Sequence, residues 1–312
     1  MSKIIFIVGP TATGKTEASF LLARKIGAEI VSADAMLVYE EPRIITSKPP
    51  AYMLKEVKHY FVSMVSVRDS YSVFDYSLSA SKIIKDLVNK DIPIIVCGGS
   101  GLYTKAILDG IFEGPGKDEN LRKKLAKTAQ AHGNEYLYRK LKEVDPESAK
   151  KISFNDLRRI IRALEVYHLS GRPLSEKKKE AIGLWGKLSI QILGLRLKRK
   201  NLYERINKRT DEMFAQGAVD EVRDLLTIEL SLTAKKILGI SDIERFLNGD
   251  LNEEESKEIL KKNTRNFAKR QVTWFKKDKR IQWISTDELS TEQVADAILG
   301  LLQNATVPDY ID

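Results

Sequence analysis

The hydrophobic positions of this chain change period along its length. An apolar run, Ile4–Val8, predicts a buried strand, and the segment after it has apolar residues at helical spacing from Ala18 to Ile26. Short apolar runs that predict further strands alternate with helical patterns such as that of residues 75–89; they lie at residues 28–34, 60–65, 92–97 and 188–195. This alternation predicts a parallel α/β sheet with ligands at the carboxyl ends of its strands.

The stretch after the first strand is the most informative motif. The pattern G-x-x-x-x-G-K-T lies between a predicted strand and a predicted helix, which is the full context of a phosphate-binding loop (P-loop). This context favours a P-loop over a glycine-rich turn that binds no ligand. Its backbone N–H groups and the helix N-terminus would surround an anion, Lys15 would reach the distal phosphate oxygens, and Thr16 is placed to ligate a phosphate-bound Mg²⁺. We expect a di- or triphosphate, or a pyrophosphate ester, to bind to Gly9, Pro10, Thr11, Ala12, Thr13, Gly14, Lys15 and Thr16.

The period changes again in the middle of the chain. Residues 113–187 are helical and strongly charged in pattern, strand character returns at 188–195, and helical patterns continue to the C-terminus. We therefore expect a P-loop NTPase-like α/β core made of residues 1–112 and 188–312, with a helical insertion of residues 113–187 and a helical C-terminal region.

Composition excludes several classes. The chain has 312 residues, of which 43% are hydrophobic and 30% charged, which is typical of a globular protein. Since it begins almost directly with a strand and has no apolar run long enough to span a bilayer, we expect no signal peptide, no membrane anchor and a cytoplasmic location. We also expect a monomer. Cys97, the single cysteine, excludes an internal disulfide and a multi-cysteine zinc site, and its apolar strand favours a core position over a nucleophile.

Positive charge is concentrated in two places. The net charge is +9, and residues 257–280 hold ten Lys or Arg, Lys269 and Arg270 among them, against two acids, with aromatic residues between them. A second cluster consists of Arg158, Arg159 and Arg162. Excess lysine is compatible with a solvated helix face, but two dense clusters favour a polyanionic macromolecule such as a nucleic acid.

Three further positions are candidates for the site. Asp34 ends the second predicted strand, where it is able to bind a metal through water, accept a proton or cap the next helix. The small residues 98–101, which include Ser100, allow a ligand to approach, although a tight turn alone would also explain them. Arg209 lies in the apolar stripe of a helix, with Arg205 at its edge, so it requires an anion, either an internal carboxylate or the bound phosphates.

The chain resembles the tRNA dimethylallyltransferases (tRNA isopentenyl-diphosphate transferases) nearly from end to end. The most specific similarities are Asn155–Tyr167, Leu202–Met213 and Asn263–Phe275; the others are the P-loop, Ser32–Asp34, Val38–Tyr39, Thr46–Pro49, His59–Tyr60, Tyr71–Val73, Gly98–Tyr103 and Asp145–Pro146. This resemblance implies transfer of the dimethylallyl group from dimethylallyl diphosphate to N6 of the adenosine 3′-adjacent to the anticodon, with release of pyrophosphate.

The resemblance also implies roles for the candidate residues. Lys15, Thr16 with Mg²⁺, Arg209 and Arg205 would stabilise the departing pyrophosphate, Asp34 would accept the N6 proton, and Ser100 would help to hold the amine or the phosphate. Basic helices would grip the phosphates of the tRNA anticodon stem-loop around an adenine extruded from its stack. The tRNA-binding residues would be Asp34, Ala35, Met36, Leu37, Arg158, Arg159, Arg162, Lys269 and Arg270.

One departure from the family pattern concerns the base. The family usually has Gln where this chain has Leu37, and that Gln is expected to hydrogen-bond the target adenine. Three alternatives remain. One is an adenylate (AMP or ATP) prenyltransferase, which has no use for the helical insertion, and another is a P-loop kinase of a small metabolite, in which Asp34 would position a hydroxyl. The third is an RNA-binding protein with a decayed site.

Overall fold

The described chain, residues 4–304 of the computed structural model, forms two compact units. One unit contains residues 4–105 and 185–304, and the other is Ala106–Leu184. The α/β class with a parallel sheet, which the alternating pattern predicts, is confirmed.

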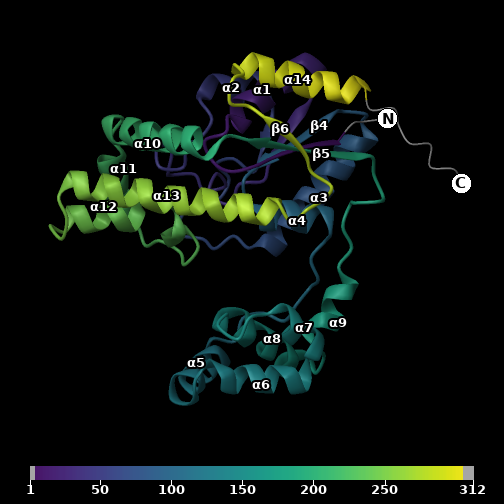
Figure 1. Ribbon diagram of the computed structural model, residues 1–312, viewed down its shortest axis with the longest axis vertical. Helices are drawn as coiled ribbons and strands as arrows, with labels where there is room; N and C mark the ends of the chain where they lie inside the picture. The colour runs from purple at the N-terminus through teal and green to yellow at the C-terminus, as the bar shows by residue number, and fades with distance from the viewer. Residues whose placement is uncertain (1–3, 305–312) are drawn as a thin grey trace, which may run out of the picture. The chain divides into compact units, whose positions relative to one another are not determined.

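Six parallel strands form the sheet of the first unit, in the order β3-β2-β4-β1-β5-β6. Figure 1 labels β4, β5 and β6 of this sheet. Central β1 pairs with β4 on one side and with β5 on the other, and all of its residues are buried. Strands covered on both faces are typical of parallel sheets and explain the continuous apolar runs. The strands are β1 Ile4–Val8, β2 Glu29–Ser32, β3 His59–Tyr60, β4 Ile94–Gly98, β5 Ile190–Arg196 and β6 Gln282–Ser285.

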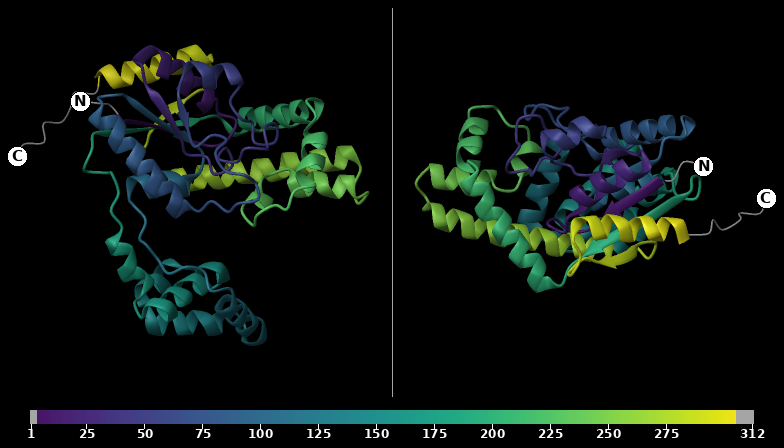
Figure 2. Two further views of the ribbon diagram at one scale, coloured as in Figure 1. Left: turned by 180° about the vertical axis from the view of Figure 1, so that it is seen from behind. Right: turned by 90° about the horizontal axis from the view of Figure 1, so that it is seen from above.

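Helices complete the core of this unit. The first helix after β1, α1 (Lys15–Ile26), lies beside the last, α14 (Thr291–Asn304), as the views of Figure 2 also show. Leu22, Ile95 and Ile298 belong to the hydrophobic cluster that joins them to the sheet. The other helices of the N-terminal half are α2 Ala51–Glu56, α3 Val73–Asn89 and α4 Gly101–Leu108.

The C-terminal part of the same unit is mainly helical. It contains α10 Arg199–Ala215, α11 Ala218–Leu226, a short 3₁₀ turn at Ala234–Lys236, α12 Ile240–Leu247 and α13 Glu253–Phe275. The two long helices α10 and α13 lie side by side (Figure 1) and meet through Leu202, Ile206 and Ala268. Ala12 of the P-loop packs against this small cluster, so the loop contacts the two helices directly.

The second unit is a helical domain with its own hydrophobic core. Leu137, Leu141 and Ile160 are fully buried in it. Its ends meet, because the Leu184 N–H donates to the Ile107 carbonyl at 3.0 Å. Its helices are α5 Glu119–His132, α6 Asn134–Val144, α7 Pro146–Lys151, α8 Leu157–Ser170 and α9 Leu174–Lys177, followed by a 3₁₀ turn at Lys178–Glu180.

One predicted strand is wrong. Only His59–Tyr60 of that region pairs as β3, whereas Phe61 and Ser63 have φ of 61° and 53° and turn the chain away from the sheet. Val65 makes just an isolated bridge with Tyr39. The strand β6, in contrast, lies in a stretch that the hydrophobic pattern did not predict as a strand.

Candidate active site and nucleic-acid interface

The P-loop connects β1 to α1 in an unusual backbone conformation. Gly9 has φ of 140°, and a Cβ there would lie 2.4 Å from the Leu195 carbonyl oxygen, so only glycine fits. Gly14, with φ of 82°, precedes the helix, and Ala12 is a non-glycine residue with φ of 64°. Backbone strain of this kind is often found at ligand-binding loops. The Thr13 hydroxyl donates to the Pro10 carbonyl at 2.9 Å and braces the loop from within.

Two cations lie at this loop. Lys15 is buried and its Nζ donates to the Pro10 carbonyl at 2.6 Å. Arg209 of α10 donates from Nη2 to the Thr11 hydroxyl at 2.7 Å. Burial lowers the pKa of Lys15 and that of Arg209, while the negative charge of Asp34 acts in the opposite direction on both. The three charged groups therefore belong to one electrostatic site.

The described part of the chain does not support an internal salt bridge of Arg209. Among residues 4–304, no carboxylate pairs with its guanidinium, which bonds to the Thr11 hydroxyl. A half-buried cation without a carboxylate is suited to an anionic ligand. Arg205, one turn earlier, is exposed.

Asp34 follows β2, and its loop is fastened to the end of β4. Asp34 Oδ1 accepts the Met36 N–H at 2.9 Å, so one carboxylate oxygen has the local capping role. The Ser100 hydroxyl accepts the Ala35 N–H at 3.0 Å, and the Ser100 N–H donates to the Ala33 carbonyl at 3.1 Å. Ser100 therefore supports the segment that carries Asp34, which is a contact that the sequence did not predict.

Leu37 is half-buried in this segment. Its backbone carbonyl accepts the Ser63 N–H at 2.9 Å, so its place in the loop is fixed through the main chain.

Glu221 of α11 anchors the chain after this segment, and no motif in the sequence indicates this role. Its carboxylate accepts the N–H groups of Arg43, Ile44 and Ile45 at 2.6 to 3.1 Å. Lys48 Nζ donates to two carbonyls of the same loop, each at 2.8 Å. Burial, together with the nearby positive charge of Arg43, lowers the pKa of Lys48 to about 8. An acidic residue on the apolar face of α11 was the only signal in the sequence.

A second missed residue is Gln271 of α13. It is buried and bonds both to the P-loop, at the Thr11 N–H, and to the Gly99 carbonyl. Its signal in the sequence is a polar side chain on the helix face that also buries Thr264, Ala268 and Phe275.

The basic residues of α13 differ in their surroundings. Lys257 and Lys261 near its start pair with acidic side chains, at 2.8 Å with Glu253 and 2.7 Å with Asp211. Lys269 and Arg270 are exposed farther along, next to Trp274, which is 40% exposed. The positive surface of α13 is therefore concentrated in its second half.

The arginine cluster of the helical unit is divided as well. Arg158 and Arg159 are exposed on α8, although Arg159 contacts Asp156 at 3.2 Å. Arg162 points inward and donates to Glu165 at 2.6 Å. The expected tRNA contact of Arg162 has to compete with this bond, so the outward charge of the cluster comes from the other two arginines.

Glu165 is fully buried and organises this part of the helical unit. It accepts two bonds from Arg122, at 2.7 and 2.8 Å, the bond from Arg162 and the Asp118 N–H at 3.0 Å. Burial alone would raise the pKa of Glu165, but these bonds outweigh it and lower the pKa to about 2.

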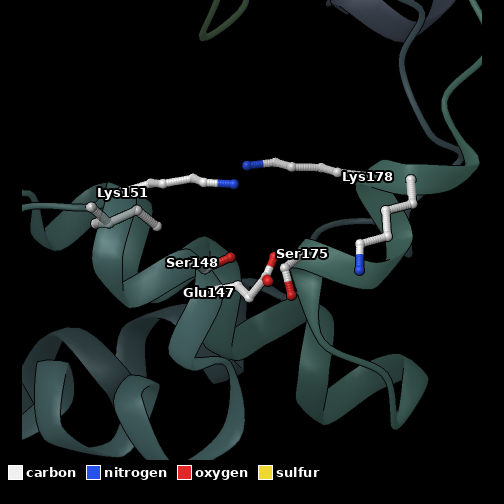
Figure 3. Close-up of a pocket in the computed structure, with 7 residues that line it drawn as sticks. Glu147, Ser148, Lys151, Ser175 and Lys178 are labelled. Carbon is white, nitrogen blue, oxygen red and sulfur yellow. The ribbon is translucent and has the colours of Figure 1, made fainter.

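A pocket of about 180 Å³ lies between α7 and α9 in the helical unit. Lys151 and Lys178 reach it from opposite sides, above Ser148 and Ser175 (Figure 3). Lys179 and Glu147 also line it, so its charge is predominantly positive.

Other kinds of site have no support in the described chain. In residues 4–304 there is no cluster of three His, Cys, Asp or Glu side chains that could hold a metal ion, and no helix there is long and apolar enough to cross a membrane. Cys97 is half-buried, and burial raises the pKa of its thiol, as expected for a core residue.

Known proteins are similar to this chain in sequence and in fold. The chain is 43% identical over 288 residues to the tRNA dimethylallyltransferase of Halothermothrix orenii, covering 91% of this chain and 88% of that protein. It is 42% identical to the enzyme of the same name from Caldanaerobacter subterraneus subsp. tengcongensis, covering 93% of each.

Solved structures agree with these relatives. The tRNA isopentenylpyrophosphate transferase of Bacillus halodurans superimposes with a TM-score of 0.69 at 31% identity, covering 97% of both chains. A eukaryotic dimethylallyltransferase acting on tRNA gives a TM-score of 0.79 at 26% identity, covering 96% of this chain and 78% of that one. The family model described as IPP transferase matches residues 37–278. The chain is therefore a member of the IPP transferase family.

Proposed function

We propose that this protein transfers the dimethylallyl group of dimethylallyl diphosphate to N6 of the adenosine 3′-adjacent to the anticodon of tRNA. The observation that carries the proposal is that Lys15 and Arg209 both bond to the P-loop, at the Pro10 carbonyl and the Thr11 hydroxyl, where the negative charge of Asp34 also acts on both cations. The names of the relatives support the same reaction. Since the acceptor is tRNA, we expect the protein to act in the cytoplasm, and one chain carries all of the proposed residues, so a monomer suffices.

The proposed reaction is a substitution at the first carbon of the prenyl group. The N6 nitrogen of adenosine forms a bond to this carbon, the bond from the carbon to the diphosphate oxygen breaks, and pyrophosphate leaves. Negative charge grows on the leaving group, so Lys15, Arg209 and the N–H groups of the P-loop stabilise the transition state more than the ground state. Arg205 is exposed and would act from the rim of the site.

The nitrogen loses a proton as it forms the new bond. Asp34 would accept this proton, and since Oδ1 is already engaged by the Met36 N–H, the proton would go to the other carboxylate oxygen. Ser100 keeps the carboxylate in place by holding the Ala35 N–H. Ala35, Met36 and Leu37 would form the surface that meets the adenine.

A divalent cation such as Mg²⁺ fits the residues that are present. The Thr16 hydroxyl, in the first turn of α1, is the protein ligand that we propose for it. Mg²⁺ commonly binds through few protein groups, together with phosphate oxygens and water, which agrees with the small number of carboxylates here. Once bound, the ion would neutralise charge on the diphosphate.

The tRNA would be gripped through its phosphates. Exposed Arg158 and Arg159 on α8, and Lys269 and Arg270 on α13, are the proposed contacts for the anticodon stem-loop. Arg162 is the weakest of the proposed contacts because Glu165 holds it.

The proposal is tested by offering labelled dimethylallyl diphosphate with Mg²⁺ to the anticodon stem-loop of tRNA, to AMP and to ATP in parallel. The expected result is label on the RNA, at the adenosine 3′ of the anticodon, and none on the free nucleotides. Label on AMP or ATP alone would assign an adenylate prenyltransferase. Tight RNA binding without transfer to any acceptor would assign an RNA-binding protein with a decayed site.

A further inference from the structure

Helix α13 places one carboxamide between two loops of the site. Gln271 Oε1 accepts the Thr11 N–H of the P-loop at 2.8 Å, and Gln271 Nε2 donates to the Gly99 carbonyl at 2.9 Å. Gly99 precedes Ser100, the residue that holds the segment with Asp34. We infer that Gln271 is a positioning residue that fixes the P-loop relative to the Ser100 turn, and so the diphosphate relative to the carboxylate that receives the proton. This inference rests on the proposed function.

The chain leaves room for this contact at the turn itself. A Cβ on Gly99 would lie 2.3 Å from Gln271 Nε2, and a Cβ on Gly101 would lie 2.2 Å from Cδ1 of Trp274. Any side chain at either glycine would displace α13 or its side chains. Two glycines thus permit the close approach of the helix, at the two places where Gln271 and Trp274 dock.

The chemistry of the two contacts requires an amide. The P-loop presents an N–H donor and the turn presents a carbonyl acceptor, so the bridging side chain must accept at one atom and donate at another. A glutamate has the length but no donor, an asparagine is shorter, and a lysine has no acceptor. Gln271 is buried, so either group would be left without its partner if the carboxamide were removed.

Thr11 is the point through which Gln271 acts. Its N–H is held by Gln271 and its hydroxyl by Arg209, so the first half of the P-loop is fixed by one residue from each long helix. The inferred role of Gln271 requires no contact with either substrate. Its loss would alter the shape of the diphosphate site while Lys15, Arg209 and Asp34 remain in the chain.

The test compares Gln271→Met, which keeps the length and removes both polar contacts, with the unmutated protein. We measure binding of pyrophosphate with Mg²⁺ by calorimetry, the single-turnover rate at saturating substrates, the affinity for the anticodon stem-loop and the melting temperature. Pyrophosphate affinity and the single-turnover rate should each fall about tenfold or more, because both buried partners are left unpaired. RNA affinity should change less than about threefold, since the charges that attract phosphates are all retained.

Ser256→Ala is the matched control on the same helix. Ser256 is fully buried and donates to the Asp242 carbonyl at 3.0 Å, so the variant also loses a buried hydrogen bond of α13. It should lower the melting temperature without changing pyrophosphate affinity or the single-turnover rate. If Gln271→Met behaves like Ser256→Ala, the positioning role is refuted and Gln271 only stabilises the fold.

A double-mutant cycle gives an independent test. Gly99→Ala should reduce pyrophosphate affinity about tenfold in the unmutated background, because the new methyl group displaces the Gln271 carboxamide. In a Gln271→Ala background the methyl group has space, so the same change should cost less than about twofold. Equal costs in both backgrounds would overturn the inference. If neither Gln271 variant folds, an unchanged pyrophosphate affinity of folded Gly99→Ala would overturn it by itself.

The two proposals fail in different ways. Pyrophosphate binding requires no acceptor, so an unmutated protein that transfers no prenyl group would refute the proposed reaction alone. Unchanged pyrophosphate affinity and rate in a folded Gln271→Met variant would refute the positioning role alone.

Discussion

Replacement of Arg209 by alanine tests how the proposed site stabilises its leaving group. The guanidinium bonds to the Thr11 hydroxyl at 2.7 Å and, in the described part of the chain, has no carboxylate partner. Its charge is therefore available to a phosphoryl oxygen. Loss of one such preorganised donor costs about 3 kcal/mol in the transition state, which corresponds to roughly a 10²-fold lower kcat.

The same variant should remain folded. Arg209→Ala removes no ion pair and relieves the cost of keeping a cation in a half-buried place, so the melting temperature should stay within about 5 °C. Lys208→Ala on the same helix is the control, since that side chain is 80% exposed and should leave kcat unchanged.

The assay is the single-turnover rate of transfer to the anticodon stem-loop, together with melting curves with and without pyrophosphate and Mg²⁺. Pyrophosphate should raise the melting temperature of the unmutated protein and of Lys208→Ala more than that of Arg209→Ala. A rate within about threefold of the unmutated protein would refute the reasoning. So would a variant Arg209→Ala that unfolds while Arg209→Lys keeps full activity, because Arg209 would then be structural.

Four further changes test other parts of the site. Asp34→Asn keeps the shape of the carboxylate but not its basicity, so transfer should nearly stop while dimethylallyl diphosphate and RNA still bind in equilibrium titrations. Leu37→Gln should raise kcat/KM for the anticodon stem-loop about tenfold if the adenine edge is otherwise unpaired, and a neutral or harmful effect in steady-state kinetics would show that other contacts read the base. Replacing Arg158 and Arg159 together by Gln should raise KM for tRNA and leave pyrophosphate binding unchanged. The slope of log RNA affinity against log salt concentration should become shallower by about 2, and an unchanged slope would exclude both residues as phosphate contacts. Because the pKa of Glu165 is lowered from 4.5 to about 2, its ionised form should add about 3 kcal/mol to the free energy of unfolding above pH 4.5, and this stabilisation should be lost as the pH falls toward 2. Urea unfolding followed by circular dichroism should show a smaller loss of stability over this pH range in Glu165→Gln.

The P-loop and the parallel sheet could be predicted because they depend on short stretches of chain. The P-loop is recognisable from the residues 9–16 alone, and five successive apolar residues predict the buried strand β1. The helical stripe that contains Arg209 was equally local, and the structure places its guanidinium at the loop.

The remaining features are not encoded in the hydrophobic pattern. Gln271 meets Thr11 across 260 positions of sequence, and no periodicity encodes such a pair. Arg162 belongs to a basic run that looks exposed, yet Glu165, three residues on, takes it inward. The strand predicted after Tyr60 was wrong because left-handed residues end β3, and β-propensity does not reveal a turn made by Phe61.

The closed ends of the helical unit make it a separable module. The bond from Leu184 to Ile107 joins the two crossing segments, and a Cβ on Gly183 would lie 2.0 Å from the Leu108 carbonyl oxygen, so entry and exit are in contact. A domain with adjacent termini and its own apolar interior is easily inserted into, or exchanged within, a host fold. Under the proposed function, a change in the RNA contacts of this unit would therefore require no change in the sequence of the sheet.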